Sequence, residues 1–364
     1  MGTVGVLVGY AQFLRRFVRG RRRPDAAARS AERREWPATC NRSRHMTALP
    51  QLAGDRLFVT DGGLETTLLF HQGIDLPAFA AFPLLDDPAG RAALTEYFAP
   101  YLELARERGA GFILDTPTWR ASADWGPELG YGAADIERIN RDAVAFAQEL
   151  RSVAGGSPDP IVINGAVGPR GDGYVPGALM TPAQAQAYHS AQIGAFAEAG
   201  ADMVSAITMN YVEEALGIAH SARDFGMPVA VSFTVETDGR LPTGQPLGEA
   251  IEQVDAETRA YPSYYMVNCA HPEHFENVLQ KPWSARIGGL RANASRKSHA
   301  ELNESPEADI GNPAELGAQY AALKRSELPR LNVMGGCCGT DHRHIERIAA
   351  ACAPFFRQRK VVNA

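Results

Sequence analysis

The segment LNVMGGCCGT (331–340) places two of the five cysteines of this 364-residue chain side by side between glycines. Neighbouring cysteines rarely bridge each other, because the disulfide geometry strains the peptide between them. A third cysteine, Cys269, follows the apolar run YYMVN (264–268). Zinc prefers a tetrahedral set of thiolate or imidazole ligands, and the glycines around the CC pair would let the backbone bend about one ion. We therefore predict that Cys269, Cys337 and Cys338 bind one Zn²⁺.

Three protein ligands leave one position of a tetrahedral zinc open, which is typical of catalytic sites. A substrate thiol would fit that position. A free alkyl thiol has a pKa of about 8.5, and a coordinating thiol is deprotonated outright, which makes it a nucleophile held in place. An activated methyl group is a natural electrophile for it. The competing interpretation is that the cysteines are small core residues, which is what we predict for Cys352 in IAAACAPF.

Histidines near these cysteines are weaker candidates. His271 and His274 follow Cys269, and His342 and His344 follow the CC pair. Each could be a ligand or a proton carrier, but we predict that His342 and His344 are solvated at the start of a helix.

Short apolar runs alternate with amphipathic stretches from residue 57 onward. The strand candidates are 57–61, 112–116, 161–165, 202–208, 228–233, 264–268, 286–290 and 331–335. Continuously apolar strands indicate a sheet that is covered on both faces. Eight such βα units in about 300 residues predict an α/β protein with a single (β/α)8 barrel. The alternative is an open doubly wound sheet, but DGGLET after the first strand is not the glycine loop typical of that fold.

In a barrel of this kind, chemistry is expected at the carboxyl ends of the strands. Glycine, asparagine, aspartate, threonine and cysteine gather there. The segments concerned are TDGGLET (60–66), DTPTWRAS (115–122), NGAVGPRGDGY (164–174), NCAHPEHF (268–275) and GGCCGTDH (335–342).

Composition and charge narrow the classes of function that the chain could have. The net charge is −6 and offers no basic footprint for nucleic acid. No apolar run approaches the about 20 residues of a membrane span, and an odd number of cysteines in a long chain favours a reducing, cytoplasmic location. The expected partners are therefore small molecules. The sequence does not indicate an oligomeric state.

Residues 1–45 differ from the rest of the chain. They hold eleven arginines, no lysine and three acidic residues, with little periodicity. This extension is interpreted as a targeting or membrane-surface segment, a basic tail, or sequence upstream of a true start at Met46. The barrel is predicted to occupy residues 46–364.

Five segments together resemble the homocysteine S-methyltransferase family. They are DGGLET, GAVGPRGD, PVAVSFTVETDGRLPTGQPLGEAI, VNCAHPEHF and GGCCGTDHRHI. That family includes betaine–homocysteine methyltransferase, S-methylmethionine-dependent enzymes and the homocysteine module of methionine synthase. The resemblance implies a zinc-dependent barrel with the three cysteines as ligands. It also implies that Asp61 and the backbone N–H groups of Gly62 and Gly63 hold the amino-acid end of homocysteine, and that Asn268 and Thr116 line the pocket.

Asp61 and Asn268 are accordingly our catalytic candidates. Asp61, Gly62, Gly63, Glu65, Thr116 and Trp119 are our substrate-binding candidates. The predicted function is methyl transfer from a small sulfonium or ammonium donor to a zinc-bound thiol, most simply homocysteine giving methionine. The chain lacks a D-x-H-x-x-G cobalamin motif. The aromatic residues Trp119, Tyr174 and Tyr211 could face a cationic donor or simply pack within loops.

One position departs from the family. The family has an acid after the fourth strand that helps hold the substrate ammonium, and here the matching residue is Ile207. Either Asp115 or Glu65 replaces it, or the acceptor thiol is not homocysteine. Three further alternatives are a zinc-dependent barrel hydrolase, a redox dithiol protein using Cys337 and Cys338, and a non-catalytic scaffold with a closed zinc site.

Overall fold

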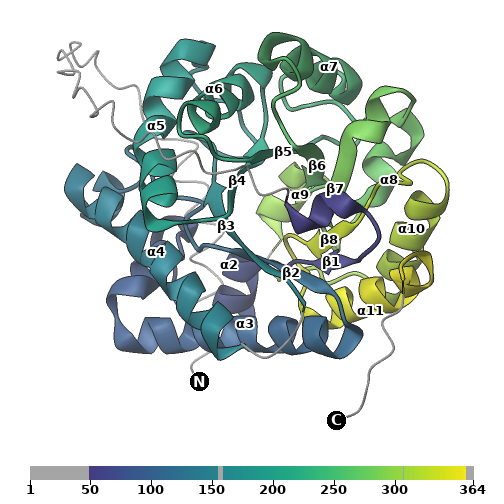
Figure 1. Cartoon of the computed structure of the whole chain (residues 1–364), viewed down its shortest axis with the longest axis horizontal. Coiled ribbons are helices and arrows are strands. Elements are labelled where there is room, and N and C mark those ends of the chain that lie inside the picture. The colour runs from purple at the N-terminus through teal and green to yellow at the C-terminus, as the bar shows by residue number, and fades with distance from the viewer. Residues whose placement is uncertain (1–48, 155–158, 306, 358–364) are drawn as a thin grey trace.

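The computed structural model describes residues 49–154, 159–305 and 307–357, and it contains a closed parallel barrel of eight strands in chain order (Figure 1). The strands are β1 (Phe58–Val59), β2 (Gly111–Asp115), β3 (Ile161–Val167), β4 (Met203–Met209), β5 (Val229–Phe233), β6 (Tyr264–Asn268), β7 (Ile287–Ala292) and β8 (Val333–Gly336). Each overlaps one of the predicted runs. The predicted (β/α)8 barrel is confirmed, and the open-sheet alternative is wrong because β1 pairs with β8. The extension 1–45 lies outside the described residues.

Helices alternate with the strands and surround the barrel (Figure 1). They are α2 (Leu64–Thr66), α3 (Pro88–Arg108), α4 (Ala133–Val153), α5 (Pro182–Ala199), α6 (Val212–Asp224), α7 (Leu247–Thr258), α8 (Pro272–Phe275), α9 (His299–Glu304), α10 (Pro313–Arg325) and α11 (His342–Cys352). None of the helices in the described part of the chain has the length and apolarity needed to cross a bilayer.

The ends of α5 show how the sequence sets these boundaries. The Thr181 hydroxyl accepts a hydrogen bond from the Gln184 N–H, and the Gln184 side chain accepts one from the Thr181 N–H. Pro182 occupies the first turn. Gly200 ends the helix at φ 86°, a left-handed conformation that costs glycine no Cβ clash.

Residues alternate between two apolar cores along each strand. One face packs against the surrounding helices. The other forms a smaller interior cluster that includes Phe58, Ile113, Val162, Met203 and Ile207. Because strand side chains alternate with a period of two, Asp115, Asn268 and Arg291 share the inward parity of that cluster at the carboxyl ends of β2, β6 and β7. The fold therefore directs these polar side chains toward the barrel axis.

A short 3-10 helix, Pro50–Ala53, precedes the barrel and packs into it. Leu49 is buried within the interior cluster. Gln51 is buried too, and its Nε2 lies 3.2 Å from the sulfur of Met203. The barrel thus needs the chain from Leu49, eight residues before the first predicted strand residue.

Deleting residues 1–45 is expected to leave folding and activity unchanged, whereas deleting residues 1–54 is expected to destabilise the barrel. Removing the buried Leu49 side chain alone costs about 1.5–3 kcal/mol. Melting temperature and activity of the two truncated proteins check this pair. A shorter truncation that aggregates or melts several degrees lower would show that the arginine-rich segment belongs to the fold.

Candidate metal centre

The three predicted cysteine ligands meet at one point. Cys269 directly follows β6, and Cys337 and Cys338 directly follow β8, so only β7 separates them around the barrel. Their sulfur atoms all lie within 4.8 Å of one another. In the part of the chain that the structure describes, this is the one group of three or more potential metal ligands brought together in this way.

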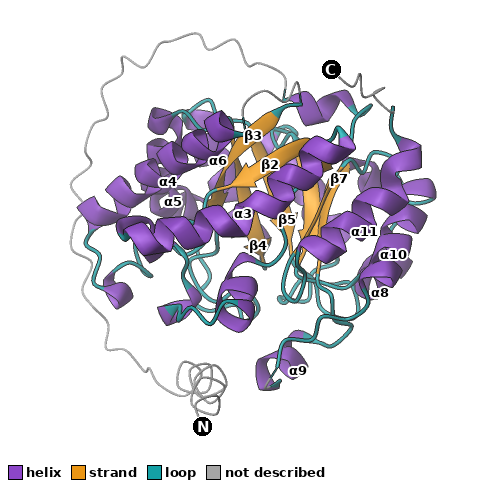
Figure 2. Ribbon diagram, turned by 90° about the horizontal axis from the view of Figure 1, so that it is seen from below, coloured by secondary structure: helices purple, strands orange, loops and turns teal. Residues whose placement is uncertain are grey.

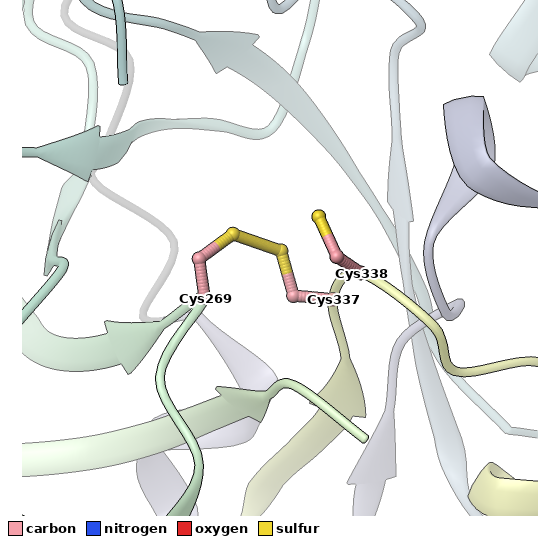
Figure 3. Close-up of side chains that lie close together, drawn as sticks. All are labelled: Cys269, Cys337 and Cys338. Carbon is pink, nitrogen blue, oxygen red and sulfur yellow. A yellow bond between two sulfur atoms is a disulfide. The ribbon is translucent and has the colours of Figure 1, made fainter. Parts of the chain in front are cut away.

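Two of these sulfurs are bonded to each other. Figure 3 shows a disulfide between Cys269 and Cys337, with the free thiol of Cys338 beside it. The zinc site predicted from the sequence needs all three as thiolates, whereas here only Cys338 is a free thiol among them. The reason is proximity, since the two Cα atoms are 5.4 Å apart and within disulfide range. Both cysteines must be reduced before they can bind a metal.

The backbone holds Cys269 in an unusual conformation. Its φ is 53°, in the left-handed region that non-glycine residues seldom occupy. Asn293 Nδ2 donates to its carbonyl at 3.0 Å, and His299 Nε2 donates to the same carbonyl at 2.6 Å. Strain of about 1–3 kcal/mol is typical of residues held this way at functional sites. These two bonds hold the Cys269 carbonyl, and with it the backbone, in place.

The DGG motif brings the loop after β1 against the loop after β8. A Cβ atom at Gly63 would lie 2.7 Å from the carbonyl oxygen of Cys337, and one at Gly62 would lie 2.7 Å from that of Thr340. Close approach of the two backbones therefore requires glycine at both positions. The Gly63 N–H donates to the Thr340 carbonyl at 3.0 Å. In this structure the Gly63 N–H is therefore engaged within the protein, and its role in holding substrate stays a prediction.

A cavity of about 700 Å³ opens beside the cysteines. Every predicted site residue lines it. They are Asp61, Gly62, Gly63, Glu65, Thr116, Trp119, Asn268, Cys269, Cys337 and Cys338. Ile207, Asp115, Tyr174 and Arg291 also contribute to the wall, whereas Tyr211 lines a different cavity. Residues from the ends of seven strands, all but β5, thus converge on one space.

Arg291 was not identified from the sequence. Its Nη2 bonds Asp61 Oδ1 at 2.5 Å, its Nη1 bonds Asp115 Oδ2, and its Nε donates to the Gly336 carbonyl at 3.2 Å. Burial raises the pKa of Asp61 to about 6, against the lowering effect of Arg291. The available signal was an arginine at the end of an otherwise apolar strand, where a lone charge would need buried partners.

The other oxygens of the two aspartates are also engaged. Tyr97, from α3, donates its phenol O–H to Asp61 Oδ2 at 2.9 Å. Asn164 donates to Asp115 Oδ1 at 2.7 Å. Both carboxylates therefore have protein partners on each oxygen, and their first role here is to hold Arg291 and the strand ends together.

Asn268 and Thr116 are similarly committed to the protein. Asn268 Oδ1 accepts from the Thr208 N–H at 3.0 Å and from the Ser232 hydroxyl at 2.6 Å, and its Nδ2 donates to the Thr208 hydroxyl at 2.8 Å. The Thr116 hydroxyl accepts from the Ala166 N–H at 3.0 Å. Asn268 thereby supports Thr208, a β-branched residue at φ 65°. In this structure Asn268 and Thr116 therefore position the cavity wall through their hydrogen bonds to the protein.

Ile207 lies directly before Thr208, in the part of β4 where the pairing with β5 shifts register. It belongs to the interior apolar cluster, and Trp119 packs against the same cluster. The Trp119 indole Nε1 donates to the Ile207 carbonyl at 3.3 Å. Behind it, the Arg120 guanidinium lies 3.7 Å from the Trp125 ring centroid and 4.5 Å from that of Trp119. This wall of the cavity is therefore apolar, and Arg120 packs against the Trp119 ring and supports it.

Glu65 is the third acidic residue in the cavity wall, with Asp61 and Asp115. It lines the cavity, and burial raises its pKa to about 7. Arg291 pairs with Asp61 and Asp115, and within the described part of the chain Glu65 forms no ion pair with it. An ammonium beside it would favour the charged form.

The histidines do not join the three cysteines. His271 caps α8 through Nδ1, and burial lowers its pKa to about 4. His342 is exposed as predicted, but His344 is fully buried and its Nε2 bonds the Ile310 carbonyl at 2.8 Å. The prediction of a solvated His344 is wrong because α11 turns that face inward. Cys352 is buried in the helix-facing core, as predicted.

The sequence model of the homocysteine S-methyltransferase family matches residues 58–352, which span the barrel from β1 to the end of α11. The chain belongs to this family. Family membership makes it a methyltransferase.

Two curated relatives are similar over most of the chain. Homocysteine S-methyltransferase YbgG of Bacillus subtilis is 24% identical over 81% of this chain and 94% of its own length. Methionine synthase of Mycobacterium tuberculosis is 26% identical over 87% of this chain but only 26% of its own length.

Solved structures of the homocysteine methyltransferase MmuM from Escherichia coli share the fold. The oxidised form matches with a TM-score of 0.64 at 20% identity, and the metallated form with 0.62 at 21%; each match covers 81% of this chain and 96% of that one.

Proposed function

We propose that the protein is a zinc-dependent thiol S-methyltransferase that transfers a methyl group from a small sulfonium or ammonium donor to homocysteine, giving methionine. The observation that carries this proposal is the convergence of three cysteine sulfurs within 4.8 Å on the wall of a cavity. The similarity to relatives that are homocysteine methyltransferases supports homocysteine as the acceptor. Donors of the S-methylmethionine, S-adenosylmethionine and betaine type all supply the required activated methyl.

The cysteine set fits a zinc ion once the disulfide is reduced. Burial raises the pKa of the Cys338 thiol above its usual value, so a bound cation is needed to keep this sulfur anionic near neutral pH. Zinc held by the three thiolates would deprotonate the acceptor thiol at its fourth position. No histidine or carboxylate joins the cluster within the described residues, which argues against a water-activating hydrolase site.

The protein's own residues would orient the acceptor. Asp61, Arg291 and Asp115 hold the ends of β2 and β7 to the loop after β1. Ile207 and Trp119 provide an apolar wall that excludes water from the reacting sulfur. Glu65 would take the substrate ammonium, in place of the acid that the family has at the position of Ile207.

A matrix of thiols and methyl donors tests the function. Purified, reduced protein should be assayed with its zinc content measured, using homocysteine and simple mercapto acids against the three donor types. Methyl transfer to homocysteine that depends on zinc supports the proposal. Hydrolysis of an ester or amide panel without thiol would instead favour the barrel hydrolase.

Glu65→Gln is expected to weaken homocysteine binding without affecting 4-mercaptobutyrate, which lacks the ammonium. A charge-assisted hydrogen bond contributes about 1.5–3 kcal/mol, or roughly tenfold to hundredfold in affinity. Dissociation constants of the two thiols for wild type and variant check this result.

Ile207→Glu is the matched control. No gain in homocysteine affinity is expected, because Glu65 already serves the ammonium and the new carboxylate would be buried in an apolar cluster. A wild-type protein that prefers 4-mercaptobutyrate to homocysteine would contradict the proposed acceptor and favour a thiol without an ammonium.

A further inference from the structure

A second cavity of about 550 Å³ lies beside the first. The two share Thr66, Tyr174 and Cys338 in their walls. The remaining lining of the second cavity comes mainly from the loop after β7 and from α9, a helix that stands off the barrel in Figure 2. Cys338 is therefore approached from two sides, whereas Cys269 and Cys337 line only the first cavity.

Aromatic rings stand at the boundary between the two cavities. The Tyr174 and His299 rings stack with their centroids 4.1 Å apart, and the Tyr174 hydroxyl lies 3.5 Å from the Cys338 sulfur. His299 is held by its bond to the Cys269 carbonyl. Phe70 adds a further ring to the second cavity. The Tyr174 ring is thus held beside the Cys338 sulfur, with one face covered by His299.

The charge of the second cavity is negative. Asp309 and Glu307 line it. The Ser295 hydroxyl donates to Asp309 at 2.7 Å and lowers the pKa of that carboxyl, which keeps it anionic. Lys297 lies 3.7 Å from Asp309 and offsets part of this charge. Aromatic faces together with surplus carboxylates are the environment that attracts a small organic cation.

We propose that this second cavity binds the onium end of the methyl donor, a sulfonium or quaternary ammonium group, against the Tyr174 ring. This inference rests on the function proposed above and adds the place and chemistry of donor binding. The acceptor would occupy the first cavity, which contains all three cysteines. The donor would approach its sulfur past Cys338 from the second.

Methyl transfer is an in-line displacement, and two adjacent cavities provide for it. The acceptor thiolate supplies the electron pair of the new S–CH₃ bond, and the bond from that methyl to the onium sulfur or nitrogen breaks. The pair from the broken bond stays on the leaving atom, which becomes a neutral thioether or tertiary amine. In-line displacement needs the leaving atom on the side of the methyl opposite the thiolate. Loss of the positive charge weakens the contact with Tyr174 and the carboxylates, which favours release of the demethylated donor.

Tyr174→Leu removes the ring face and is expected to raise the donor KM about tenfold, with the homocysteine KM within twofold of wild type. Tyr174→Phe keeps the face and should recover most of the donor affinity. Asp309→Asn should raise the donor KM severalfold by removing charge. Tyr211→Phe is the matched control, because Tyr211 lines a cavity that shares no residue with the second one.

Direct binding provides a readout independent of turnover. Saturation-transfer NMR of tetramethylammonium and of S-methylmethionine, on zinc-loaded protein without thiol, should show contact in wild type and its loss in Tyr174→Leu. Melting temperatures confirm that each variant is folded.

A failure of the proposed function can be distinguished from a failure of the donor-cavity assignment. A wild-type protein that transfers methyl from no onium donor overturns the proposed function, and the binding readout then still decides whether the cavity holds an onium. Normal transfer by wild type, with donor KM and tetramethylammonium contact unchanged in Tyr174→Leu and Asp309→Asn, overturns the assignment of the cavity. A rise in homocysteine KM as large as that in donor KM would also overturn it, by showing that the second cavity serves the acceptor.

Discussion

Replacing any one of Cys269, Cys337 and Cys338 with alanine is expected to remove bound zinc and methyl transfer together. The reduced wild-type protein should hold about one zinc per chain. Three thiolates with sulfurs within 4.8 Å are the ligand set present, and two remaining thiolates leave a four-coordinate zinc with half of its positions to be filled by water or substrate. Metal analysis and activity measured on the same reduced samples check the prediction.

Cys352→Ser is the control for this series. Cys352 is fully buried in α11 within the helix-facing core, and burial raises the pKa of its thiol to about 12. Its replacement should leave zinc content unchanged even if stability falls slightly. Loss of zinc in this variant, or retention of stoichiometric zinc in Cys338→Ala, would show that the ligand assignment is wrong.

Replacing Arg291 with methionine is expected to destabilise the fold by about 3–5 kcal/mol, the range for removing one partner of a buried ion pair. Arg291 is 8% exposed and bonds both Asp61, 2% exposed, and Asp115, 9% exposed. The substitution strands two buried carboxylates. Urea denaturation of wild type and variant measures the loss.

The loss should depend on pH. Burial raises the pKa of Asp61 from 3.8 to about 6 in the folded protein, while Arg291 lowers it. Because the pKa of Asp61 is higher in the folded protein, the neutral carboxyl contributes to the stability of the fold, and this contribution is lost as pH rises through about 6. Without Arg291 this pKa rises further, so destabilisation should be largest above pH 6 and smaller at pH 5.

Two companion variants bracket this result. Arg291→Met combined with Asp115→Asn should recover part of the stability, because it removes one stranded charge. Arg151→Met breaks an exposed pair with Asp202 and should cost at most about 1 kcal/mol. An Arg291→Met protein as stable as Arg151→Met at pH 8 would mean that the buried ion cluster does not hold the strand ends together.

The sequence by itself determined the barrel and the location of its chemistry. Apolar runs that alternate with amphipathic helices are local patterns, and each of the eight predicted runs became a strand. The rule that parallel strands end at one rim then placed Cys269 with Cys337 and Cys338. The apolar helical segment around Cys352 was enough to predict that this residue is buried.

Only the tertiary structure decided which groups were free to act. Arg291 pairs with Asp61 and Asp115 across 230 and 176 residues of chain, and no local pattern connects them. The Gly63 N–H and the Asn268 amide fit the family's substrate contacts by position, yet the structure uses them to bond Thr340 and Thr208. His344 has a polar sequence context but lies buried. The second cavity beside Cys338 likewise exists only because the loop after β7 folds back past Tyr174. The physical reason is that periodicity reports which face of an element is buried. Which polar partners meet on that face depends on the register and closure of all eight strands together.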